Sequence, residues 1–531
     1  DENWNAVVKI FQRGEFPGEP DIQAGIYMLA GRALANLDRH HEAIRLFFNV
    51  ERLSPLTDLG FEASYRRLAS FYEVNGPNIA AQADSLIEIY GGKHPDHKWV
   101  QLALVMKAET LFHRDRMAEA AAAYSEVSPK NLPEDLLPGL YFKRGWALAE
   151  SGDYNRAAQD LTTFISRFPD DPRVLQALAQ RGSAYLKLGD RSSALKDFDQ
   201  LLATATEPNI QAFAHQHRGR IFREDRRYES MIEAYTTLLN EHDRLSRDTV
   251  ANANYWIGWG WFKLDEWAKC LPYLEQARSL VPANYKEPAG THLVIAAYSL
   301  KDAEQLKKAV IRLQSDVPGK RLPVKMLTWL GLQLFQQGDF DGADTFLTLA
   351  SNPEDPADTD LIVWRHLAKA RIELRHYSRA MDVLPIVLER EESDFWRTDA
   401  CLDKVHALIG LGKWDEARVA CHEGLQMDPH GTILAGLNMS LGKIAMQRKD
   451  YESAAASFLR TAEVFIDDRE IKPLALHLAA EALDGLERAD QAAEIRAQLK
   501  REFPEWKPRP EPPAAPAPEP AEPAAAEAAK S

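Results

Sequence analysis

The 531-residue chain has few cysteines, no long apolar run and a deficit of basic residues. Its three cysteines are too few for a disulfide framework or for a zinc site made of four thiolates. No window approaches the roughly 18 apolar residues of a membrane-spanning helix, so we expect no direct transmembrane segment. Because 64 Lys and Arg stand against 79 Asp and Glu, the net charge is −15. This balance does not favour nucleic acid as a partner, since such proteins need a basic face.

Signatures of catalysis and of cofactor binding are also missing. The Gly-Trp-Gly run at 258–260 begins a phosphate-loop pattern, but Lys263 stands where the third glycine is required. His94 and His97 share one loop, and loop polarity explains them better than metal binding does. We therefore predict that the protein is not an enzyme and has no catalytic residue, no cofactor and no metal.

The N-terminal end begins at Asp1, without an initiator Met and without the basic and apolar segments of a signal peptide. Such a start fits a processed terminus. Residues 1–20 are predicted to form an N-terminal helix followed by a linker, because a helical pattern gives way to a segment rich in Gly and Pro.

The segment 141–169 shows the unit that organises the chain. Apolar residues recur at helical spacing on both sides of a turn. At the turn, Gly152 suits a left-handed position that ends one helix, and Asp153 suits the cap that starts the next. The pattern predicts a helix–turn–helix hairpin whose two helices cross at the small residues Gly145 and Ala157.

The same twelve-residue offset recurs along the chain, with a period of about 37 residues. The further pairs are Gly31–Ala43, Ala69–Ala81, Ala108–Ala120, Gly182–Ala194, Gly219–Met231, Gly258–Cys270, Ala297–Ala309, Gly331–Ala343, Ala368–Ala380, Val405–Ala417, Gly442–Ala454 and Ala480–Ala492. Because each hairpin leaves one apolar face uncovered, the next hairpin stacks on it. We predict an all-α fold, a right-handed superhelical solenoid of about thirteen hairpins.

Two repeats depart from the pattern, and they bear on the domain organisation. Residues 61–95 end late, and residues 288–318 keep the offset while their turn is displaced. We predict an N-terminal arm at 21–287, a degenerate joint at 288–323 and a C-terminal arm at 324–506. Eight of the 25 residues at 507–531 are Pro, which predicts a disordered Pro/Ala-rich tail.

The cysteines occupy positions in this pattern. Cys270 takes one of the small-residue crossing positions. Cys401 and Cys421 lie on the two helices of one hairpin, where a disulfide is an alternative in an oxidising compartment. We expect two buried free thiols instead.

With these features the chain resembles a tetratricopeptide-repeat protein. The residues that carry the resemblance are Gly-Asp-Tyr-Asn-Arg-Ala at 152–157 with Pro169, and Gly-Lys-Trp-Asp-Glu-Ala at 412–417 with Pro429. The resemblance covers roughly residues 21–506. It implies a non-catalytic scaffold that binds a protein or peptide partner in a concave groove.

In such arrays the groove is lined by the residues three before, one after and four after the small residue of each first helix. Aromatic residues gather at these positions in the fourth and seventh repeats, and we predict them as the partner-binding residues: Phe142, Trp146, Tyr255, Trp259 and Phe262. In the C-terminal arm the positions hold Thr328, Leu332, Phe335, Arg365, Lys369 and Ile372. Exposed aromatics of this density mark a binding surface. The alternative is that neighbouring repeats bury them. The Lys/Asn/Arg set by which some relatives clamp a C-terminal carboxylate is absent.

Two other functions remain open: a carbohydrate- or lipid-reading accessory subunit of an envelope enzyme or transporter, and the repeat portion of a larger enzyme. A peptide site adds polar partners for the backbone, whereas a sugar site pairs flat aromatics with carboxylates. The Phe-Pro closures at 168–169 and 503–504 resemble those of tetratricopeptide proteins of the Gram-negative envelope. We therefore expect a periplasmic or outer-membrane-associated protein, with the cytoplasm as the alternative. The sequence assigns no oligomeric state.

Overall fold

A computed structural model describes residues 2–14, 16, 18–241 and 245–508. Over these residues the chain forms 27 α-helices, one π-helical segment and three short 3₁₀ segments, and it has no strand. After the first helix, the remaining helices pair in chain order as helix–turn–helix hairpins. The prediction of an all-α solenoid of hairpins is confirmed. The predicted tail at 507–531 lies outside the described residues, apart from its first two.

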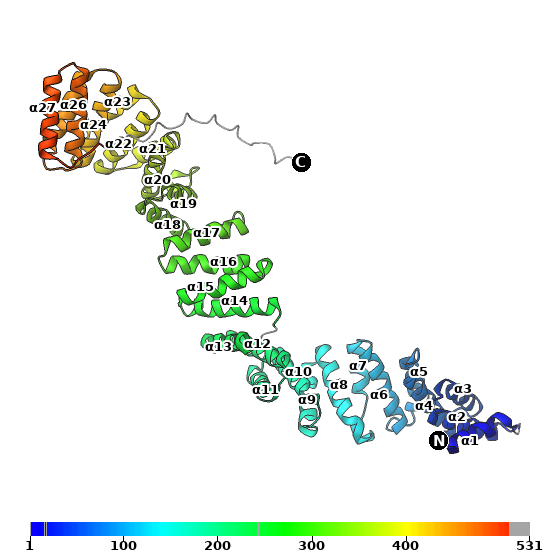
Figure 1. Ribbon diagram of the computed structural model, residues 1–531. Helices are drawn as coiled ribbons and strands as arrows, with labels where there is room; N and C mark the ends of the chain where they lie inside the picture. Colours follow the sequence, from blue (N-terminus) through cyan, green and yellow to red (C-terminus); the bar gives the residue numbers. More distant parts are fainter. Residues whose placement is uncertain (1, 15, 17, 242–244, 509–531) are drawn as a thin grey trace, which may run out of the picture. The chain divides into compact units, whose positions relative to one another are not determined.

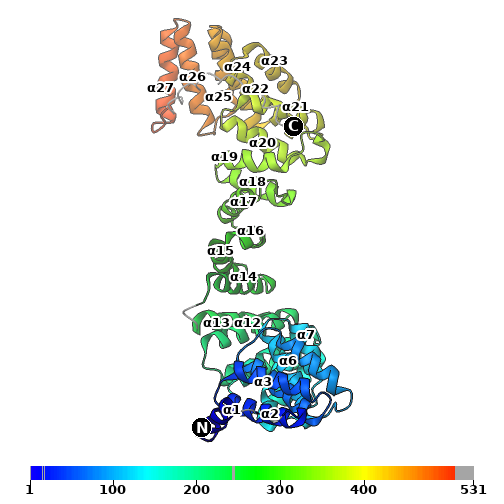
Figure 2. The same ribbon diagram turned by 90° about the vertical axis from the view of Figure 1, so that its right-hand side faces the viewer.

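The chain divides into two compact units, unit 1 (Asp1–Tyr285) and unit 2 (Lys286–Ser531). The division falls within helix α16 (Pro282–Ser299). Within each unit, successive hairpins lie side by side (Figure 1, Figure 2). The predicted arms and the predicted joint at 288–323 stay predictions.

The other helices of unit 1 follow the same hairpin order. They are α1 (Glu2–Arg13), α2 (Pro20–Asn36), α3 (His40–Leu53), α4 (Asp58–Glu73), α5 (Ile79–Leu86), α6 (Lys98–His113), α7 (Met117–Ser125), α8 (Leu137–Glu150), α9 (Tyr154–Arg167), α10 (Val174–Lys187), α11 (Arg191–Thr204), α12 (Pro208–Glu224), α13 (Tyr228–Glu241), α14 (Arg247–Lys263) and α15 (Trp267–Leu280). The irregular segments are the π-helical η1 (Ile87–Gly91) and the 3₁₀ turns η2 (Pro129–Asn131) and η3 (Glu134–Leu136).

Unit 2 continues the order. Its helices are α17 (Ala303–Asp316), α18 (Val324–Gln336), α19 (Phe340–Ala350), α20 (Leu361–Glu373), α21 (Tyr377–Arg390), α22 (Asp394–Gly410), α23 (Trp414–Gln426), α24 (Gly431–Gln447), α25 (Tyr451–Val464), α26 (Ile471–Gly485) and α27 (Ala489–Glu502), with the 3₁₀ turn η4 (Pro356–Asp358) before α20.

The small residues lie where the helices of a hairpin cross. Gly145 and Ala157 are both buried, and a Cβ atom on Gly145 would lie 2.8 Å from Cγ of Leu161. At Gly182 a Cβ atom would lie equally close to the ring of Phe198. Outside the two departing repeats, every predicted pair is buried. The two helices can therefore approach each other closely because the side chains at these positions are small or absent.

The turn between the two helices keeps one geometry. In each regular hairpin the residue seven positions after the small residue of the first helix has a positive φ. These residues are Asp38, Asp115, Gly152, Gly189, Arg226, Asp265, Gly338, Arg375, Gly412, Lys449 and Glu487. Most of them are not glycine, so packing of the two helices holds the turn even where the side chain disfavours it.

The repeat at α4 and α5 corrects one predicted pair. Ala81 is exposed, whereas Ala83 is completely buried. The turn between these helices contains two left-handed residues, Asn75 and Asn78, and is therefore longer than the others. The extra turn residues move the buried face of α5 along the sequence, so Ala69 and Ala81 are not the crossing pair.

The hairpin of α16 and α17 corrects a second pair. Its left-handed residue is Lys301, and counting back seven positions gives Val294 rather than Ala297. Val294 and Leu306, twelve residues apart, are both buried. Space for these larger residues comes from Gly290, where a Cβ atom would lie 2.9 Å from Cδ1 of Leu313. The turn is therefore regular, and Ala297 and Ala309 are not the crossing pair.

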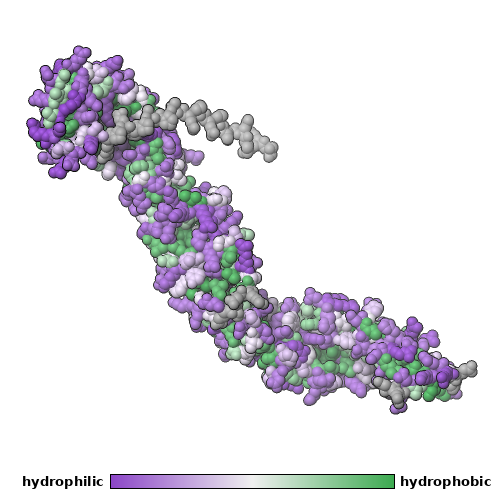
Figure 3. Space-filling view, viewed as in Figure 1, coloured by the Kyte–Doolittle hydropathy of each residue, from purple (hydrophilic) through white to green (hydrophobic). Residues whose placement is uncertain are grey.

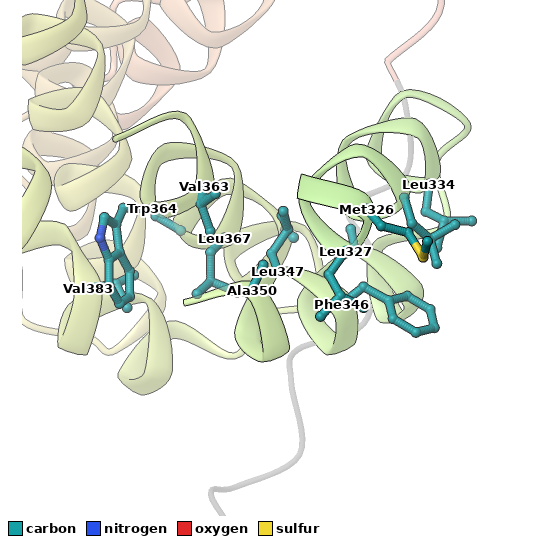
Figure 4. Packing of buried hydrophobic residues seen from close by; sticks show 14 of the residues in the cluster. Met326, Leu327, Leu334, Phe346, Leu347, Ala350, Val363, Trp364, Leu367 and Val383 are labelled. Carbon is teal, nitrogen blue, oxygen red and sulfur yellow. The ribbon is translucent and has the colours of Figure 1, made fainter. Parts of the chain in front are cut away.

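The core of each unit is a series of local clusters between neighbouring hairpins. In unit 2 the labelled side chains of α18 to α21 belong to one buried cluster, which also includes residues of α17 (Figure 4). Trp364 is the largest fully buried side chain there, and its indole nitrogen donates a hydrogen bond of 3.3 Å to the carbonyl oxygen of Pro356. Such a chain of clusters is what stacked repeats are expected to form.

Candidate functional site

A hollow of about 280 Å³ lies on unit 1, between the first helices of three successive hairpins, α8, α10 and α12. Its lining is Trp146 of α8, then Leu175, Gln176, Ala179, Gln180 and Ser183 of α10, then Asn209, Ile210 and Phe213 of α12. The hollow runs obliquely, from the C-terminal half of α8 to the first turns of α12.

Part of this lining follows from the repeat pattern. Trp146 comes one residue after Gly145 and is one of the predicted site residues. Ala179 and Ser183 hold two of the same groove positions on α10, relative to Gly182. The lining residues of α12 lie further from Gly219 than the pattern predicts, because the hollow crosses the helices at a slant.

The lining is uncharged. It combines aromatic and aliphatic side chains with two glutamines, one asparagine and one serine. Next to Phe213, the ring of His217 lies 4.2 Å away between centroids. Burial, together with the charge of Arg220, lowers the pKa of His217 to about 4, so this imidazole is neutral at pH 7. The hollow is therefore surrounded by apolar side chains and by uncharged amide groups.

Phe142 differs from the expectation of an exposed stripe, because it is only 6% exposed. Its ring lies 5.4 Å from that of Phe164, and the guanidinium of Arg173 stacks 5.2 Å from its centroid. It shares a buried cluster with Ala177 of α10, so the following hairpin covers it. Trp146, in contrast, is partly exposed, and its ring forms a T-shaped contact with that of Phe142, with 5.6 Å between the ring centroids.

The three predicted residues of α14 are partly exposed, but they do not line the hollow. Each packs against an aromatic ring of a neighbouring segment: Tyr255 on Tyr285 at 5.0 Å, Trp259 on Tyr228 at 5.6 Å and Phe262 on Trp267 at 5.1 Å. The predicted aromatic residues therefore fall in two separate areas of unit 1.

The second area has a member that the repeat pattern misses. The guanidinium of Arg223, on α12, stacks 4.0 Å from the ring centroid of Trp256 on α14. Arg223 stands at a predicted groove position, four after Gly219, but Trp256 does not. One sequence signal could have identified Trp256: it is a tryptophan next to the groove positions, on a helix that holds several aromatic residues.

In unit 2 the corresponding stripe holds ion pairs. Arg365 lies 3.5 Å from a carboxylate oxygen of Glu391. Lys369 contacts Asp399 at 2.9 Å and Asp403 at 2.8 Å. Burial raises the pKa of Asp403 to about 6. Ion pairs therefore connect α20 with α22 and with Glu391, which follows α21.

The histidine loop and the cysteines have structural roles. The Nδ1 atom of His97 accepts a hydrogen bond of 3.3 Å from the backbone N–H of Trp99, at the start of α6. In the part of the chain that the structure describes, no group of three or more His, Cys, Asp or Glu could hold a metal ion. Cys270, Cys401 and Cys421 are buried with free thiols, and burial raises the pKa of each.

The surface seen in Figure 3 is mostly hydrophilic, with apolar residues in small separate patches. Within the described ranges, no helix is both long enough and apolar enough to cross a membrane.

Two segments match family models described as tetratricopeptide repeat, at residues 140–171 and 175–205. These segments cover most of the two hairpins formed by α8 to α11. Similar solved structures include a tetratricopeptide repeat protein from Parabacteroides merdae, with 15% identity, 65% of this chain and 98% of that chain covered and a TM-score of 0.29. The C-terminal part of a TPR repeat-containing protein from Cytophaga hutchinsonii matches at 16% identity, with 57% and 99% covered and a TM-score of 0.32.

A structure of Naa15/Naa10 bound to HypK-THB matches at 13% identity, with 91% of this chain and 77% of that chain covered and a TM-score of 0.39. The two matched segments are therefore similar to tetratricopeptide repeats, and the other described helices continue the same hairpin order.

Proposed function

We propose that this protein is a non-catalytic scaffold that binds a peptide segment of a protein partner in the hollow between α8, α10 and α12. The observation that carries the proposal is the uncharged lining, in which Trp146 and Phe213 stand beside Gln176, Gln180 and Asn209. Tetratricopeptide repeats are typically non-catalytic and bind proteins, and the two matched repeats supply most of this lining.

The size of the hollow supports a peptide side chain as the occupant. Pockets for small-molecule ligands and cofactors span roughly 300–1,000 Å³ and bury most of the ligand. A hollow of about 280 Å³ lies below that range and is open to solvent along the helices. It suits one large apolar side chain while the rest of a peptide lies along the surface.

The polar groups of the lining suit a peptide backbone. Every peptide residue other than proline offers one N–H donor and one C=O acceptor. A glutamine or asparagine side chain also carries both, so it can pair with either group without adding charge. Carboxylates, which would pair with sugar hydroxyls, are absent from the lining residues of this hollow. This composition favours the peptide over the carbohydrate alternative.

The aromatic area of α14 extends the proposed site. Tyr255, Trp259 and Phe262 are partly exposed, and we assign them to a second contact area for a longer partner segment. Phe142 contributes indirectly, since it is buried and its ring packs in a T-shaped arrangement against that of Trp146.

The test uses a phage-displayed library of random 12-residue peptides panned against the full chain. We expect enriched peptides that share an apolar or aromatic position. Trp146→Ala should lower their affinity by at least tenfold while the melting temperature changes little, because the ring is partly exposed. Trp259→Ala should weaken, in the same way, those enriched peptides that also contact the aromatic area of α14.

The control is Phe164→Ala, a completely buried residue whose truncation should lower the melting temperature by several degrees. The proposal is wrong if no peptide is enriched, or if Trp146→Ala and Trp259→Ala lose stability as Phe164→Ala does and keep every peptide.

The location of the scaffold is a further part of the proposal. The Phe-Pro closures at 168–169 and 503–504 support a role in an assembly of the Gram-negative envelope, at the periplasm or the outer membrane. Fractionation of source cells with an antibody against the chain tests this. Recovery of the protein in the cytoplasmic fraction alone would contradict it.

A further inference from the structure

One face of α12 leads away from the hollow toward α14. Phe213, Gln216, Arg220 and Arg223 recur at helical spacing and share this face. Phe213 lines the hollow at one end. At the other end Arg223 stacks on Trp256 of α14, 4.0 Å from the ring centroid. The face therefore joins the two aromatic areas of unit 1, and its middle and far parts carry guanidinium groups.

The arginines at the far end outnumber their carboxylate partners. Glu224 contacts Arg220 at 3.0 Å, Arg191 at 3.1 Å and Arg223 at 4.0 Å. Asp225 adds one further contact, at 3.3 Å, but it too goes to Arg191. Two carboxylates thus serve three guanidinium groups, and Arg220 and Arg223 share Glu224. Each guanidinium group can make two parallel hydrogen bonds to a carboxylate of its own.

These guanidinium groups are accessible from solvent. The side chain of Arg220 is 55% exposed and that of Arg223 is 25% exposed. Two more arginines, Arg226 and Arg227, follow in the turn after α12, and Arg227 stacks on Phe222 at 4.6 Å. The end of α12 is therefore a basic patch on a chain whose net charge is −15. A basic patch in that context selects a partner of opposite charge.

We infer that the peptide segment bound in the hollow is acidic on the side that faces α14, with Asp or Glu residues over Arg220 and Arg223. This inference rests on the proposed peptide-binding function and adds the chemistry of the partner. The apolar anchor lies between Trp146 and Phe213, the backbone pairs with the amides, and the carboxylates pair with the guanidinium groups.

The spacing along α12 sets the spacing in the partner. Arg220 and Arg223 come seven and ten residues after Phe213, which is about 10 and 15 Å along a helix at 1.5 Å per residue. An extended peptide advances about 3.3 Å per residue. The acidic residues therefore stand about three to five positions from the apolar anchor.

The experiment repeats the panning of random 12-residue peptides with three forms of the full chain: the unchanged protein, Arg220→Gln/Arg223→Gln and the matched control Arg45→Gln/Arg52→Gln. The control changes the charge equally at two exposed arginines of α3, far along unit 1. For the unchanged protein and the control, Asp or Glu should be enriched three to five positions from the apolar anchor. The groove double variant should keep the anchor preference and lose the acidic one.

A selected acidic peptide should then bind the groove double variant at least tenfold more weakly than it binds the control. Its affinity for the unchanged protein should fall as NaCl rises, and the dependence should be smaller for the groove variant. Enrichment of anchors without acidic residues would overturn the inference and leave the proposed function standing. Failure to enrich any peptide would overturn both.

Arginines beside aromatic rings also suit single-stranded nucleic acid. A fluorescein-labelled 12-residue oligouridylate provides that arm of the test. Binding of this probe that is lost in Arg220→Gln/Arg223→Gln and that displaces the selected peptide would overturn the acidic-peptide assignment. We expect no displacement at concentrations that saturate peptide binding.

Discussion

Gly145 and Gly152 are seven residues apart in one hairpin, and they are required for different reasons. Gly145 lies where the helices cross, and any side chain there would meet Leu161. Gly152 has open space around it but adopts a φ of +91°, which L side chains rarely take. The first position is limited by packing, and the second by backbone conformation.

Gly145→Leu should destabilise unit 1 by about 1–3 kcal/mol or more, because the added bulk separates α8 from α9. The matched control is Gly139→Ala on the same helix, where a Cβ atom has no neighbour within 4 Å. That change should stabilise by about 0.5–1 kcal/mol through helix propensity alone. Urea unfolding followed by circular dichroism measures both.

Equal effects of the two substitutions would contradict the crossing-point assignment. Gly182→Leu gives an independent repeat of the test, since its Cβ atom would meet the ring of Phe198.

His217 makes the stability of unit 1 depend on pH. Its pKa is lowered from 6.5 to about 4, mainly because burial disfavours the charged ring. Between these values the unfolded chain binds a proton and the folded chain does not, so stability present above pH 6.5 is lost as the pH falls toward 4.

The change His217→Gln removes this titration. Between pH 7 and pH 4.5 the variant should lose less stability than the unchanged protein, by about 2–3 kcal/mol for a shift of this size. Urea unfolding at a series of pH values measures the difference. Parallel pH profiles for the two proteins would show that His217 is not buried as a neutral ring.

At the scale of the helix, α16 and α17 show how a hairpin keeps its turn when its crossing residues are large. Asp302 follows the left-handed Lys301, and its Oδ1 atom accepts a hydrogen bond of 2.9 Å from the backbone N–H of Gln305. The same cap begins α9 and α11, where Asp153 and Asp190 accept from the third residue of the helix. The cap at Asp302 and the left-handed Lys301 therefore set the position of the turn in this hairpin, although no small residue occupies its crossing positions.

Asp302→Ala should therefore destabilise α17 by about 1 kcal/mol, since one backbone donor at its N-terminus loses its partner. Asp302→Asn is the control, because asparagine caps equally well and carries no charge. Hydrogen exchange at the first turn of α17 reads out the effect locally. If Asp302→Asn accelerates exchange as much as Asp302→Ala does, charge rather than capping is responsible.

For the whole molecule, the cores are local clusters. The loss of stability caused by a core substitution should therefore stay local. Phe458 is completely buried in the cluster of α24 to α27, and truncation of a buried phenylalanine typically removes 3–5 kcal/mol. In an array in which each repeat contacts its neighbours, that loss should not reach distant repeats.

Phe458→Ala should accordingly accelerate hydrogen exchange in α24 to α26 and leave α2 to α11 unchanged. Phe198→Ala provides the reciprocal experiment, since Phe198 is equally buried in unit 1. Faster exchange throughout the chain in either variant would show that the described helices unfold as one cooperative body.

The sequence by itself determined the all-α class, the hairpin and most of its crossing pairs. It could do so because each hairpin is a local structure: a small residue, a turn seven positions later and a second small residue lie within about one repeat. The same pattern placed Trp146 at a groove position. It failed at Ala81, because the turn before α5 is longer than in the other hairpins. It failed at Ala297, because the crossing residues of that hairpin, Val294 and Leu306, are large.

Only the tertiary structure decided which residues at the groove positions are accessible to solvent and which other side chains lie beside them. Phe142 and Trp146 are four positions apart on one helix, yet the next hairpin covers the first and leaves the second at the hollow. Phe213 joins Trp146 from a helix two hairpins away, and Trp256 meets Arg223 across α12 and α14. Burial of these residues depends on how successive hairpins stack, and that stacking is set by contacts between repeats that no single repeat contains.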